Sequence, residues 1–391
     1  MLGFALSEEQ RLLIMTARRF VETELMPLET EVETTGKLLP EKARAITDKS
    51  LSLGLYALNI PEQYGGGGLS ALDNTLVEEE FGRTSDILVR RALGNVYEVL
   101  LAGNDTQKER WLLPSVRGER VFSVCFTEPG AGSDSAGIKT RAKPDGNGWT
   151  LNGQKYFISD GEYSDFFVVS AVTDPDAGGR GISLFIVDKD APGLTVGRDQ
   201  EMMGLRGTSH VELFFENVKL TPDNLLGQEG KGLKLVFETL GRIRVMQIGA
   251  RAVGRATRIF GMMTNYARER KQFGQPIGEF QMVQQMLADS AIEIEAARLM
   301  VRRAAGAIDE GIDARDRISM VKVHAAETLG RVADRAVQVF GGLGYCKDLM
   351  IEKFYRDARI YRIYDGTSEI HRMVIGRGLM KNGPGLVDPL S

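Results

Sequence analysis

The chain has 391 residues, a hydrophobic content of 43% and a formal net charge of -4. A chain of this length can bury a large core and is too long for one compact core, so we expect two or three domains. Acidic and basic residues are interspersed, so the charge pattern predicts neither a nucleic-acid-binding face nor a polybasic membrane patch. No uninterrupted apolar run approaches the roughly 20 residues that span a bilayer, and we expect no membrane partner.

The first residues, MLGFALSEEQ, lack the basic start and apolar core of a signal peptide, and their acidic residues argue against a transit peptide. We therefore expect a cytosolic protein, most simply a bacterial one. Cys125 and Cys346 lie far apart in the sequence, and the three histidines form no cluster. Because neither residue type shows metal-ligand spacing, we expect no disulfide and no structural metal.

A helical pattern extends from Leu6 to about Leu101. It begins in LSEEQRLLIMTARRFVETEL, where Ser7 is a suitable N-cap, acidic residues fill the first turn and apolar residues recur on one face. The stretch NIPEQYGGGGLS interrupts the pattern, because four consecutive glycines are poor in the interior of a helix or strand. The first part of the chain is therefore predicted to be helical, with one internal loop.

Strand signals replace the helical pattern from Val121 to about Leu225. Two short strands flank a DGNG turn, and DFFVVSAVTD and ISLFIVDKD are apolar runs typical of buried strands. HVELFFENV alternates apolar residues at Val211, Leu213 and Phe215. This pattern predicts a β domain.

Long amphipathic helices return after LLGQEGKG, and FQMVQQMLADSAIEIEAARLMVRRAAGAI carries apolar residues three to four positions apart. The fold class that we predict is α+β and mostly α. It comprises a helical N-terminal domain over residues 1–120, a central β domain over residues 121–225 and a C-terminal helical bundle over residues 226–391.

Four motifs could carry chemistry, and each also has a purely structural interpretation. CFTEPGAGSD, ending at Ser133 and Asp134, is either a surface turn or a glycine-rich loop whose backbone N–H groups approach an anion or planar ring. In KYFIS, Phe157 and Ser159 share one face of a strand. Either Phe157 stacks on a planar ring and Ser159 hydrogen-bonds to the edge of that ring, or Phe157 is a core residue and Ser159 is solvated. No G-x-G-x-x-G follows a strand, so a dinucleotide would not be held in the Rossmann manner.

The other two motifs lie at helix ends. RERKQFGQP places cations where they complement a helix dipole, or where arginine binds a phosphate. QVFGGLGY is either a helix stop or a pair of glycines that admit a ligand against the backbone.

The stretch YRIYDGTSEIHR places Asp365 among aromatic residues and a glycine, just before a predicted helix. Thr367 and Ser368 are good N-cap residues for that helix. Taken alone, Asp365 is most simply a turn residue that accepts a bond from a free backbone N–H.

Together these motifs resemble the acyl-CoA dehydrogenase family of flavoenzymes, in the family's order and across nearly the whole chain. The resemblance is carried by TEPGAGSD, LNGQKYFIS, GLRGTSHVELFFENV, ERKQFGQPI, FQMVQQMLAD, QVFGGLGY and FYRDARIYRIYDGTSEI. It implies a helical N-terminal domain, a central β-barrel-like domain and a C-terminal four-helix bundle, assembled as a homotetramer. It also implies one FAD per subunit, acyl-CoA as substrate and electron-transfer flavoprotein as electron acceptor.

The resemblance also implies roles for individual residues. The flavin end of the cofactor would contact Phe126, Thr127, Gly132, Ser133, Phe157 and Ser159. The pyrophosphate and adenosine end would contact Arg270, Gln272, Phe273, Gln281, Gln338, Gly341 and Gly342, partly from a neighbouring subunit. Thr367 and Glu369 would close on the cofactor, and Ser133, Arg242 and Gly366 would contact the substrate.

In most relatives a glutamate occupies the position of Asp365 and removes the α-proton of the acyl-CoA while a hydride passes to the flavin. We expect Asp365 to be this base, because a weakly acidic α-proton needs a carboxylate beside donors to the thioester carbonyl. Some relatives place the base at the position of Gly241, which has no side chain to serve. Aspartate is also the base of nitroalkane oxidases, so a nitroalkane-oxidase-like or acyl-CoA-oxidase-like enzyme is the alternative. A flavin-binding relative without dehydrogenase activity is a third.

Overall fold

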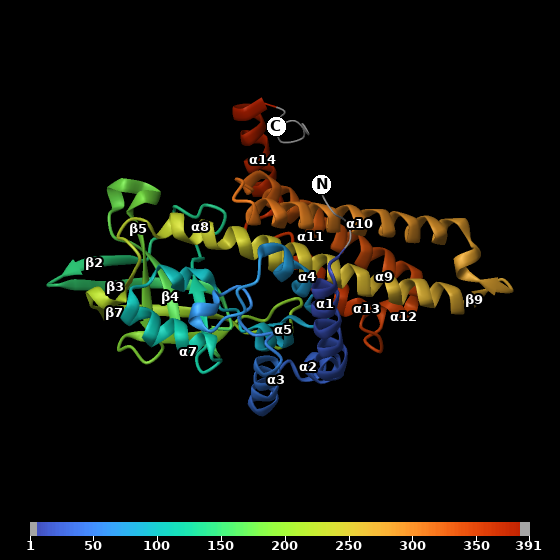
Figure 1. Ribbon diagram of the computed structural model, residues 1–391, viewed down its shortest axis with the longest axis horizontal. Coiled ribbons are helices and arrows are strands. Elements are labelled where there is room, and N and C mark those ends of the chain that lie inside the picture. Colours follow the sequence, from blue (N-terminus) through green and yellow to red (C-terminus); the bar gives the residue numbers. More distant parts are fainter. Residues whose placement is uncertain (1–5, 384–391) are drawn as a thin grey trace.

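The structure is a computed structural model that describes residues 6–383, apart from the side chain of Leu240. Residues 1–5, part of the segment in which we expect no targeting peptide, lie outside the described residues. Helical, β and helical parts follow one another along the chain, and the β part lies at one end of the long axis (Figure 1). The predicted fold class is confirmed; the domain boundaries at residues 120 and 225 stay a prediction.

The first part packs helices around its own core. Ser7 accepts a hydrogen bond from the N–H of Gln10 and starts the first helix through a capping box, as predicted. Buried residues such as Phe20, Phe81 and Leu88 form the core between these helices. The helices are α1 (Glu8–Phe20), α2 (Glu29–Thr35), α3 (Pro40–Ser52), α4 (Ala71–Phe81), α5 (Asp86–Leu93), α6 (Asp105–Gln107) and α7 (Leu113–Val116).

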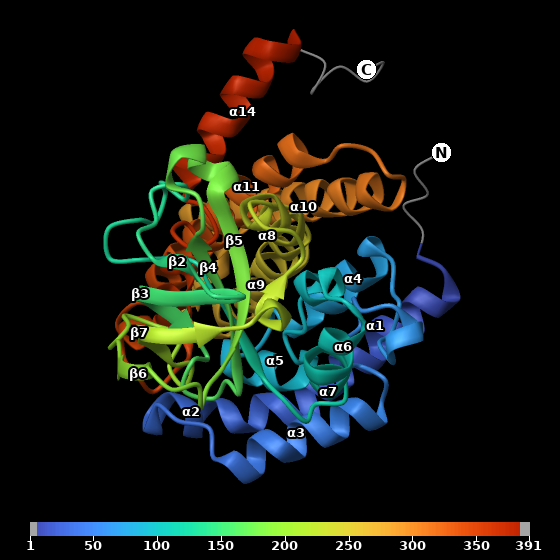
Figure 2. The ribbon, with the colours of Figure 1, turned by 90° about the vertical axis from the view of Figure 1, so that its left-hand side faces the viewer.

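The central part contains an eight-stranded mixed sheet within the described residues, in the order β6-β7-β3-β2-β4-β5-β8, with β1 parallel to β4. Its strands are β1 (Phe122–Cys125), β2 (Arg141–Asp145), β3 (Gly148–Ser159), β4 (Phe166–Val172), β5 (Ile182–Asp188), β6 (Leu194–Asp199), β7 (His210–Leu220) and β8 (Leu225–Leu226). The runs predicted as buried strands are β4 and β5, and Val211, Leu213 and Phe215 all point into the core. The sheet twists so strongly that β5 crosses β3 and β7 at a steep angle (Figure 2).

The last part is a helical bundle. It contains α8 (Gly232–Ile243), α9 (Arg251–Glu269), α10 (Gln281–Asp309), α11 (Arg315–Phe340), α12 (Gly342–Tyr345), α13 (Ile351–Ile360) and α14 (Ser368–Asn382), with a β9 (Lys271–Gln272) and β10 (Gln275–Pro276) hairpin between α9 and α10. A π-helical segment, η8 (Arg244–Ala250), joins α8 to α9 without a break.

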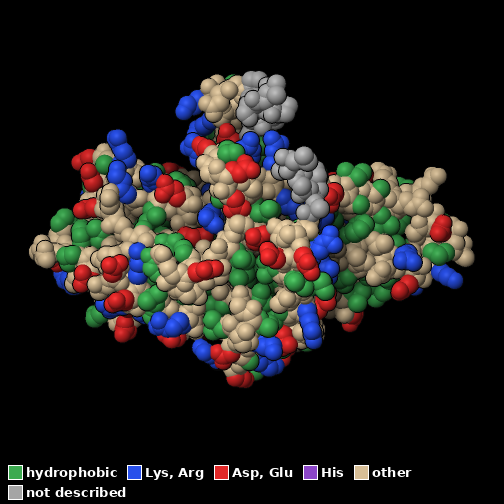
Figure 3. Space-filling view, in the orientation of Figure 1, with side chains coloured by type: hydrophobic (Ala, Val, Ile, Leu, Met, Phe, Trp, Pro, Cys, Tyr) green, Lys and Arg blue, Asp and Glu red, His purple; other side chains and the backbone are tan. Residues whose placement is uncertain are grey.

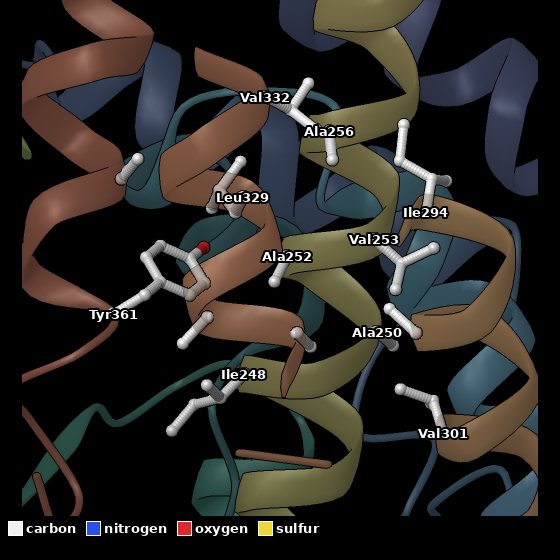
Figure 4. Close-up of a cluster of buried hydrophobic side chains, with 14 of the residues drawn as sticks. Ile248, Ala250, Ala252, Val253, Ala256, Ile294, Val301, Leu329, Val332 and Tyr361 are labelled. Atoms are coloured by element: carbon white, nitrogen blue, oxygen red, sulfur yellow. The ribbon is translucent and has the colours of Figure 1, made fainter. Parts of the chain in front are cut away.

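Small and branched side chains let the bundle helices approach closely. Ala252, Ala256 and Ile294 lie between the ribbons of α9, α10 and α11, and the ring of Tyr361 closes one side (Figure 4). Tyr361 is almost fully buried and directly precedes the turn that carries Asp365. The core of the bundle therefore fixes the position of the predicted catalytic turn.

Candidate active site

Asp365 lies in a tight turn between α13 and α14. Its backbone has a φ of 50°, in the left-handed region that aspartate tolerates better than most residues, and Gly366 follows with a φ of 88°. Thr367 caps α14 by accepting a hydrogen bond from the N–H of Ile370 at 3.2 Å. Among the residues that the structure describes, no hydrogen bond or ion pair engages the partly exposed Asp365 carboxylate. The side chain is therefore available to a ligand.

Buried cationic and polar side chains hold this turn by its carbonyl groups. Arg244 Nε lies 2.8 Å from the Asp365 carbonyl oxygen. Lys322 Nζ donates to the carbonyl oxygens of Tyr361 at 2.5 Å and Gly366 at 3.0 Å. Burial lowers the pKa of Lys322 to about 8, against the opposing attraction of the Asp365 carboxylate. The backbone around Asp365 is thus fixed while its side chain stays free.

His371 supports the same turn from α14. Burial and the nearby positive charge of Arg244 together lower its pKa to about 4, so the imidazole is neutral at pH 7. Its Nε2 lies 3.1 Å from the Asp365 carbonyl oxygen, which only accepts, so Nε2 carries the proton. Nδ1 then accepts from the Ser319 hydroxyl at 3.1 Å. A side chain on Gly366 would collide with this ring, because an added Cβ would lie 2.8 Å from His371 Nε2.

The second group of predicted residues meets at the end of β3. The N–H of Tyr156 donates to the carbonyl of Thr127 at 2.8 Å, and the Ser123 hydroxyl donates to the carbonyl of Ser159 at 2.6 Å. Phe126 and Thr127, which directly follow β1, therefore lie beside the end of β3 that carries Phe157 and Ser159. Gly132 and Ser133 are exposed in the loop that follows Thr127. A bulge between Lys155 and Ile158 leaves Phe157 with a φ of 57° and its ring 46% exposed.

Glu128 and Lys155 form a buried ion pair that holds the backbone next to this group. Lys155 is fully buried, and its Nζ lies 2.8 Å from Glu128 Oε1 and 3.1 Å from the carbonyl oxygen of Phe126. Glu128 also accepts from the backbone N–H groups of Lys139 at 2.6 Å and Thr140 at 3.0 Å. Burial raises the pKa of Glu128, but the charge of Lys155 and these hydrogen bonds outweigh it and lower the pKa overall.

Tyr97 lies within range of the charges of both Asp365 and Asp160. Burial raises its pKa to about 12, the cations Arg90 and Arg251 oppose the increase, and the carboxylates of Asp365 and Asp160 add to it. Asp160 directly follows Ser159. The end of β3 and the Asp365 turn therefore both lie near Tyr97.

The third group lies far from the β3 group (Figure 1). The ring of Tyr266, near the end of α9, stacks on that of Phe340 at a centroid distance of 4.2 Å, which brings the β9 hairpin beside the end of α11. Arg270, Gln272, Phe273 and Gln281 therefore lie near Gln338, Gly341 and Gly342. Figure 1 shows β9 and β3 at opposite ends of the long axis.

The surface around this third group is apolar and open. Phe273 is 94% exposed and Met282 is 78% exposed. Hydrophobic side chains gather on this face toward the end that carries β9 (Figure 3).

Arg242 and Glu369 do not join the Asp365 network by any hydrogen bond between described residues. Arg242, predicted to contact the substrate, instead approaches Glu98, with Nε 3.2 Å from Oε1. Glu369 is exposed on the first turn of α14.

Comparisons with known proteins identify this arrangement. The N-terminal, middle and C-terminal domains of acyl-CoA dehydrogenases match residues 7–119, 123–218 and 230–380. The chain belongs to the acyl-CoA dehydrogenase family. Members of this family are flavin-dependent oxidoreductases that act on acyl-CoA, and the resemblance of the sequence motifs is confirmed.

Individual relatives cover almost the full chain. The cyclohex-1-ene-1-carbonyl-CoA dehydrogenase of Geobacter metallireducens is 40% identical over 96% of this chain and 99% of its own length. The subunit CarC of the caffeyl-CoA reductase-Etf complex of Acetobacterium woodii is 37% identical over 96% of this chain and 99% of its own length. The structure of butyryl-CoA dehydrogenase from Megasphaera elsdenii superposes with a TM-score of 0.89 at 35% identity, covering 97% of this chain and 100% of that one.

Within residues 6–383, no helix is long and apolar enough to cross a membrane. No group of three or more His, Cys, Asp and Glu side chains in this range could hold a metal ion. Cys125 is buried and Cys346 is exposed, and both are free thiols.

Sequence reasoning missed the residues that position the site: Glu128, Lys155, Arg244, Lys322 and His371. The available signal was weak. Lys155 interrupts an otherwise apolar strand face, and Lys322 lies on the apolar face of α11, where a cation needs a buried partner.

Proposed function

We propose that this protein is an FAD-dependent acyl-CoA dehydrogenase that forms the 2-enoyl-CoA, with Asp365 as the α-proton base. The observation that carries the proposal is the turn itself. Four hydrogen bonds from Arg244, Lys322 and His371 hold its carbonyl groups, whereas the Asp365 carboxylate is left without a partner among the described residues. A base must be fixed in position and free to take a proton.

The same turn offers donors for the substrate carbonyl. The backbone N–H groups of Asp365 and Gly366 donate to no acceptor within residues 6–383. Such donors would stabilise the charge that develops on the thioester oxygen when the α-proton leaves. Asp365 Oδ would take that proton.

FAD fits the open features of the chain. A Cβ built at Gly132, Gly341 or Gly342 would meet no atom within 4 Å, so a ligand can reach the backbone there. The exposed ring of Phe157 and the hydroxyl of Ser159 would hold the flavin end. When bound, FAD supplies the acceptor for the hydride from the β-carbon.

The adenosine end would be held by a second subunit. The residues predicted for the adenosine end lie too far from β3 to share its cofactor, so we propose the homotetramer that the family resemblance implies. These residues are Arg270, Gln272, Phe273, Gln281, Gln338, Gly341 and Gly342. The projecting helix α14, with Met380 86% exposed, and the exposed Phe273 and Met282 near β9 support an assembly that covers these two parts of the surface. A size measurement that finds a stable holo monomer would contradict this.

The electron acceptor is proposed to be an electron-transfer flavoprotein. The support is that the Acetobacterium woodii relative is named as part of an Etf complex. Rapid peroxide formation during turnover without an added acceptor would instead favour an oxidase, including the nitroalkane-oxidase-like alternative.

Replacing Asp365 with Asn tests the base. Asparagine keeps the shape and the tolerance for a left-handed backbone but cannot take the proton, so reduction of the flavin by acyl-CoA should slow at least about a hundredfold. The measurement is anaerobic stopped-flow bleaching of the flavin, with flavin content unchanged. The matched control, Asp334→Asn on the exposed side of α11, should react at the native rate. An Asp365→Asn variant that reduces its flavin normally would move the base elsewhere.

A further inference from the structure

The end of β3 has an unusual backbone. Phe157 has a φ of 57° and Asp160 has a φ of 61°, and Ser159 lies between them. Few residues other than glycine adopt this left-handed region, and a bulky residue such as Phe is strained there. Strain of this kind persists only where the surrounding structure holds the backbone, and it is common at ligand-binding sites. The contacts that hold this segment therefore matter for any ligand that it binds.

Two buried serines hold the segment. The hydroxyl of Ser123, in β1, lies 2.6 Å from the carbonyl oxygen of Ser159 and 2.7 Å from the hydroxyl of Ser164, just before β4. The Ser164 hydroxyl also lies 3.0 Å from the carbonyl oxygen of Asp160. Ser123 is 4% exposed and Ser164 is 1% exposed. Both hydroxyl groups therefore depend on partners within the protein.

The number of protons decides the direction of these bonds. The two hydroxyl groups carry two protons, whereas the three contacts would need three. The carbonyl of Asp160 already accepts from the backbone N–H of Tyr163 at 2.9 Å, and the contact with the Ser159 carbonyl is the shortest of the three. Ser164 therefore donates to Ser123, and Ser123 donates to Ser159. Each bond in such a chain strengthens the next, so the Ser159 carbonyl receives a reinforced hydrogen bond.

The hydroxyl of Ser159 is free while its carbonyl is held. Ser159 is half-buried, and no hydrogen bond between residues of the described range 6–383 engages its hydroxyl. Once the backbone is fixed, a serine hydroxyl has only three staggered positions. The place of the Ser159 hydroxyl is thus set largely by the hydrogen bond that Ser123 makes to its carbonyl.

We propose that Ser123 and Ser164 are positioning residues, which fix the Ser159 hydroxyl against the edge of the flavin and so set the rate of hydride transfer. This inference rests on the proposed function, in which Ser159 holds the flavin end. Both serines are too deeply buried to touch the cofactor, so they act through the backbone of Ser159. A misplacement of about 1 Å at a reacting centre can cost up to about a hundredfold in rate.

Replacing Ser123 with Ala removes the bond to the Ser159 carbonyl. The holoenzyme is mixed anaerobically with butyryl-CoA, octanoyl-CoA and cyclohexanecarbonyl-CoA, and the one that reduces the native flavin fastest is used throughout. The limiting rate constant should fall at least about tenfold, while the half-saturating substrate concentration changes less than about threefold. The visible absorption spectrum of the bound flavin should also shift. A native rate or a native spectrum in Ser123→Ala would overturn the proposal.

The matched control is Ser183→Ala. Ser183 is fully buried in β5 of the same sheet, and its hydroxyl lies 2.8 Å from that of Thr173. This variant loses a buried hydroxyl of the same kind but should keep the native rate and spectrum. Equal losses in Ser183→Ala and Ser123→Ala would show a general effect on the sheet and overturn the proposal.

Coupling to Ser159 separates positioning from a purely structural role. Because Ser123 acts through Ser159, Ser123→Ala should slow a Ser159→Ala background by less than about twofold. Losses that multiply in the double variant, or a native rate in Ser159→Ala, would overturn the inference and leave Asp365 as the base. If Ser123→Ala does not retain FAD, Ser164→Ala takes its place and should slow the reaction at least about threefold with the same coupling. Failure of all three acyl-CoAs to reduce the native flavin would instead overturn the proposed function.

Discussion

At the scale of single residues, the site is built on side chains that never touch the reacting atoms. His371 is neutral because it is buried near the cations Arg244 and Lys322, and in that state its Nε2–H can hold the Asp365 carbonyl. Protonation would place a positive charge on the ring close to the cations Arg244 and Lys322. The pH range in which this occurs can be stated from the pKa of the ring.

His371 should make the protein lose stability in mild acid. Its folded pKa of about 4 lies below the ordinary value of 6.5, so the unfolded chain binds more protons between these pH values. The free energy of unfolding should fall as the pH drops from about 6.5 towards about 4, by about 1–3 kcal/mol from this group. His371→Gln keeps a donor for the carbonyl and removes the titration. Denaturant unfolding at several pH values should then give a flatter curve, and parallel losses in both proteins would show that His371 does not titrate there.

At the scale of elements, a buried ion pair between Glu128 and Lys155 joins the loop after β1 to β3. Lys155→Met would leave Glu128 buried without its cation, and should lower the free energy of unfolding by about 3–5 kcal/mol and weaken FAD retention. The matched control is Lys219→Met, which removes an exposed lysine paired with Asp145 in the same sheet and should change stability by less than about 1 kcal/mol. Similar losses in the two variants would mean that burial of the pair has no special role.

The elements themselves were predictable from the sequence because their signals are local. The cap at Ser7, the DGNG turn and the alternation of Val211, Leu213 and Phe215 all appear where expected. The Asp365 turn was located by its motif. Two contacts were not predictable, because they join residues far apart in the chain. They are the ion pair of Glu128 with Lys155 and the hydrogen bond from Lys322 to the carbonyl oxygen of Tyr361. Pairing of that kind depends on tertiary packing, which local periodicity does not encode.

At the scale of the whole molecule, a chain of buried charges ties the three parts together. Arg251 of α9 pairs with Glu78 of α4 at 2.5 Å and faces Asp86 of α5 at 3.7 Å. Asp86 pairs with Arg90 at 2.5 Å, and Arg90 reaches Asp160 after β3 at 3.4 Å. The relative position of the sheet and the bundle, and so of Ser159 and Asp365, depends on these contacts.

Replacing Arg251 with Met should therefore be costly. It would leave Glu78 and part of the charge of Asp86 unpaired in the interior, and we expect a loss of about 3–5 kcal/mol in the free energy of unfolding. Arg372→Met, which breaks an exposed pair with Glu327, is the matched control and should cost less than about 1 kcal/mol. Thermal and denaturant unfolding of both variants measure the difference, and a loss in Arg251→Met no larger than in the control would contradict the role of the buried charges.

The continuous helix formed by α8, η8 and α9 has a consequence for how this protein can diverge. Each residue of an α-helix advances the chain by 1.5 Å and rotates it by about 100°, so a single insertion or deletion in this helix would turn Arg244 away from the Asp365 carbonyl. The π-helical geometry of η8 already accommodates a wider turn at this point. Descendants of this sequence can therefore exchange side chains along the helix more readily than they can change its length, because a change in length would disturb the contact that holds the Asp365 turn.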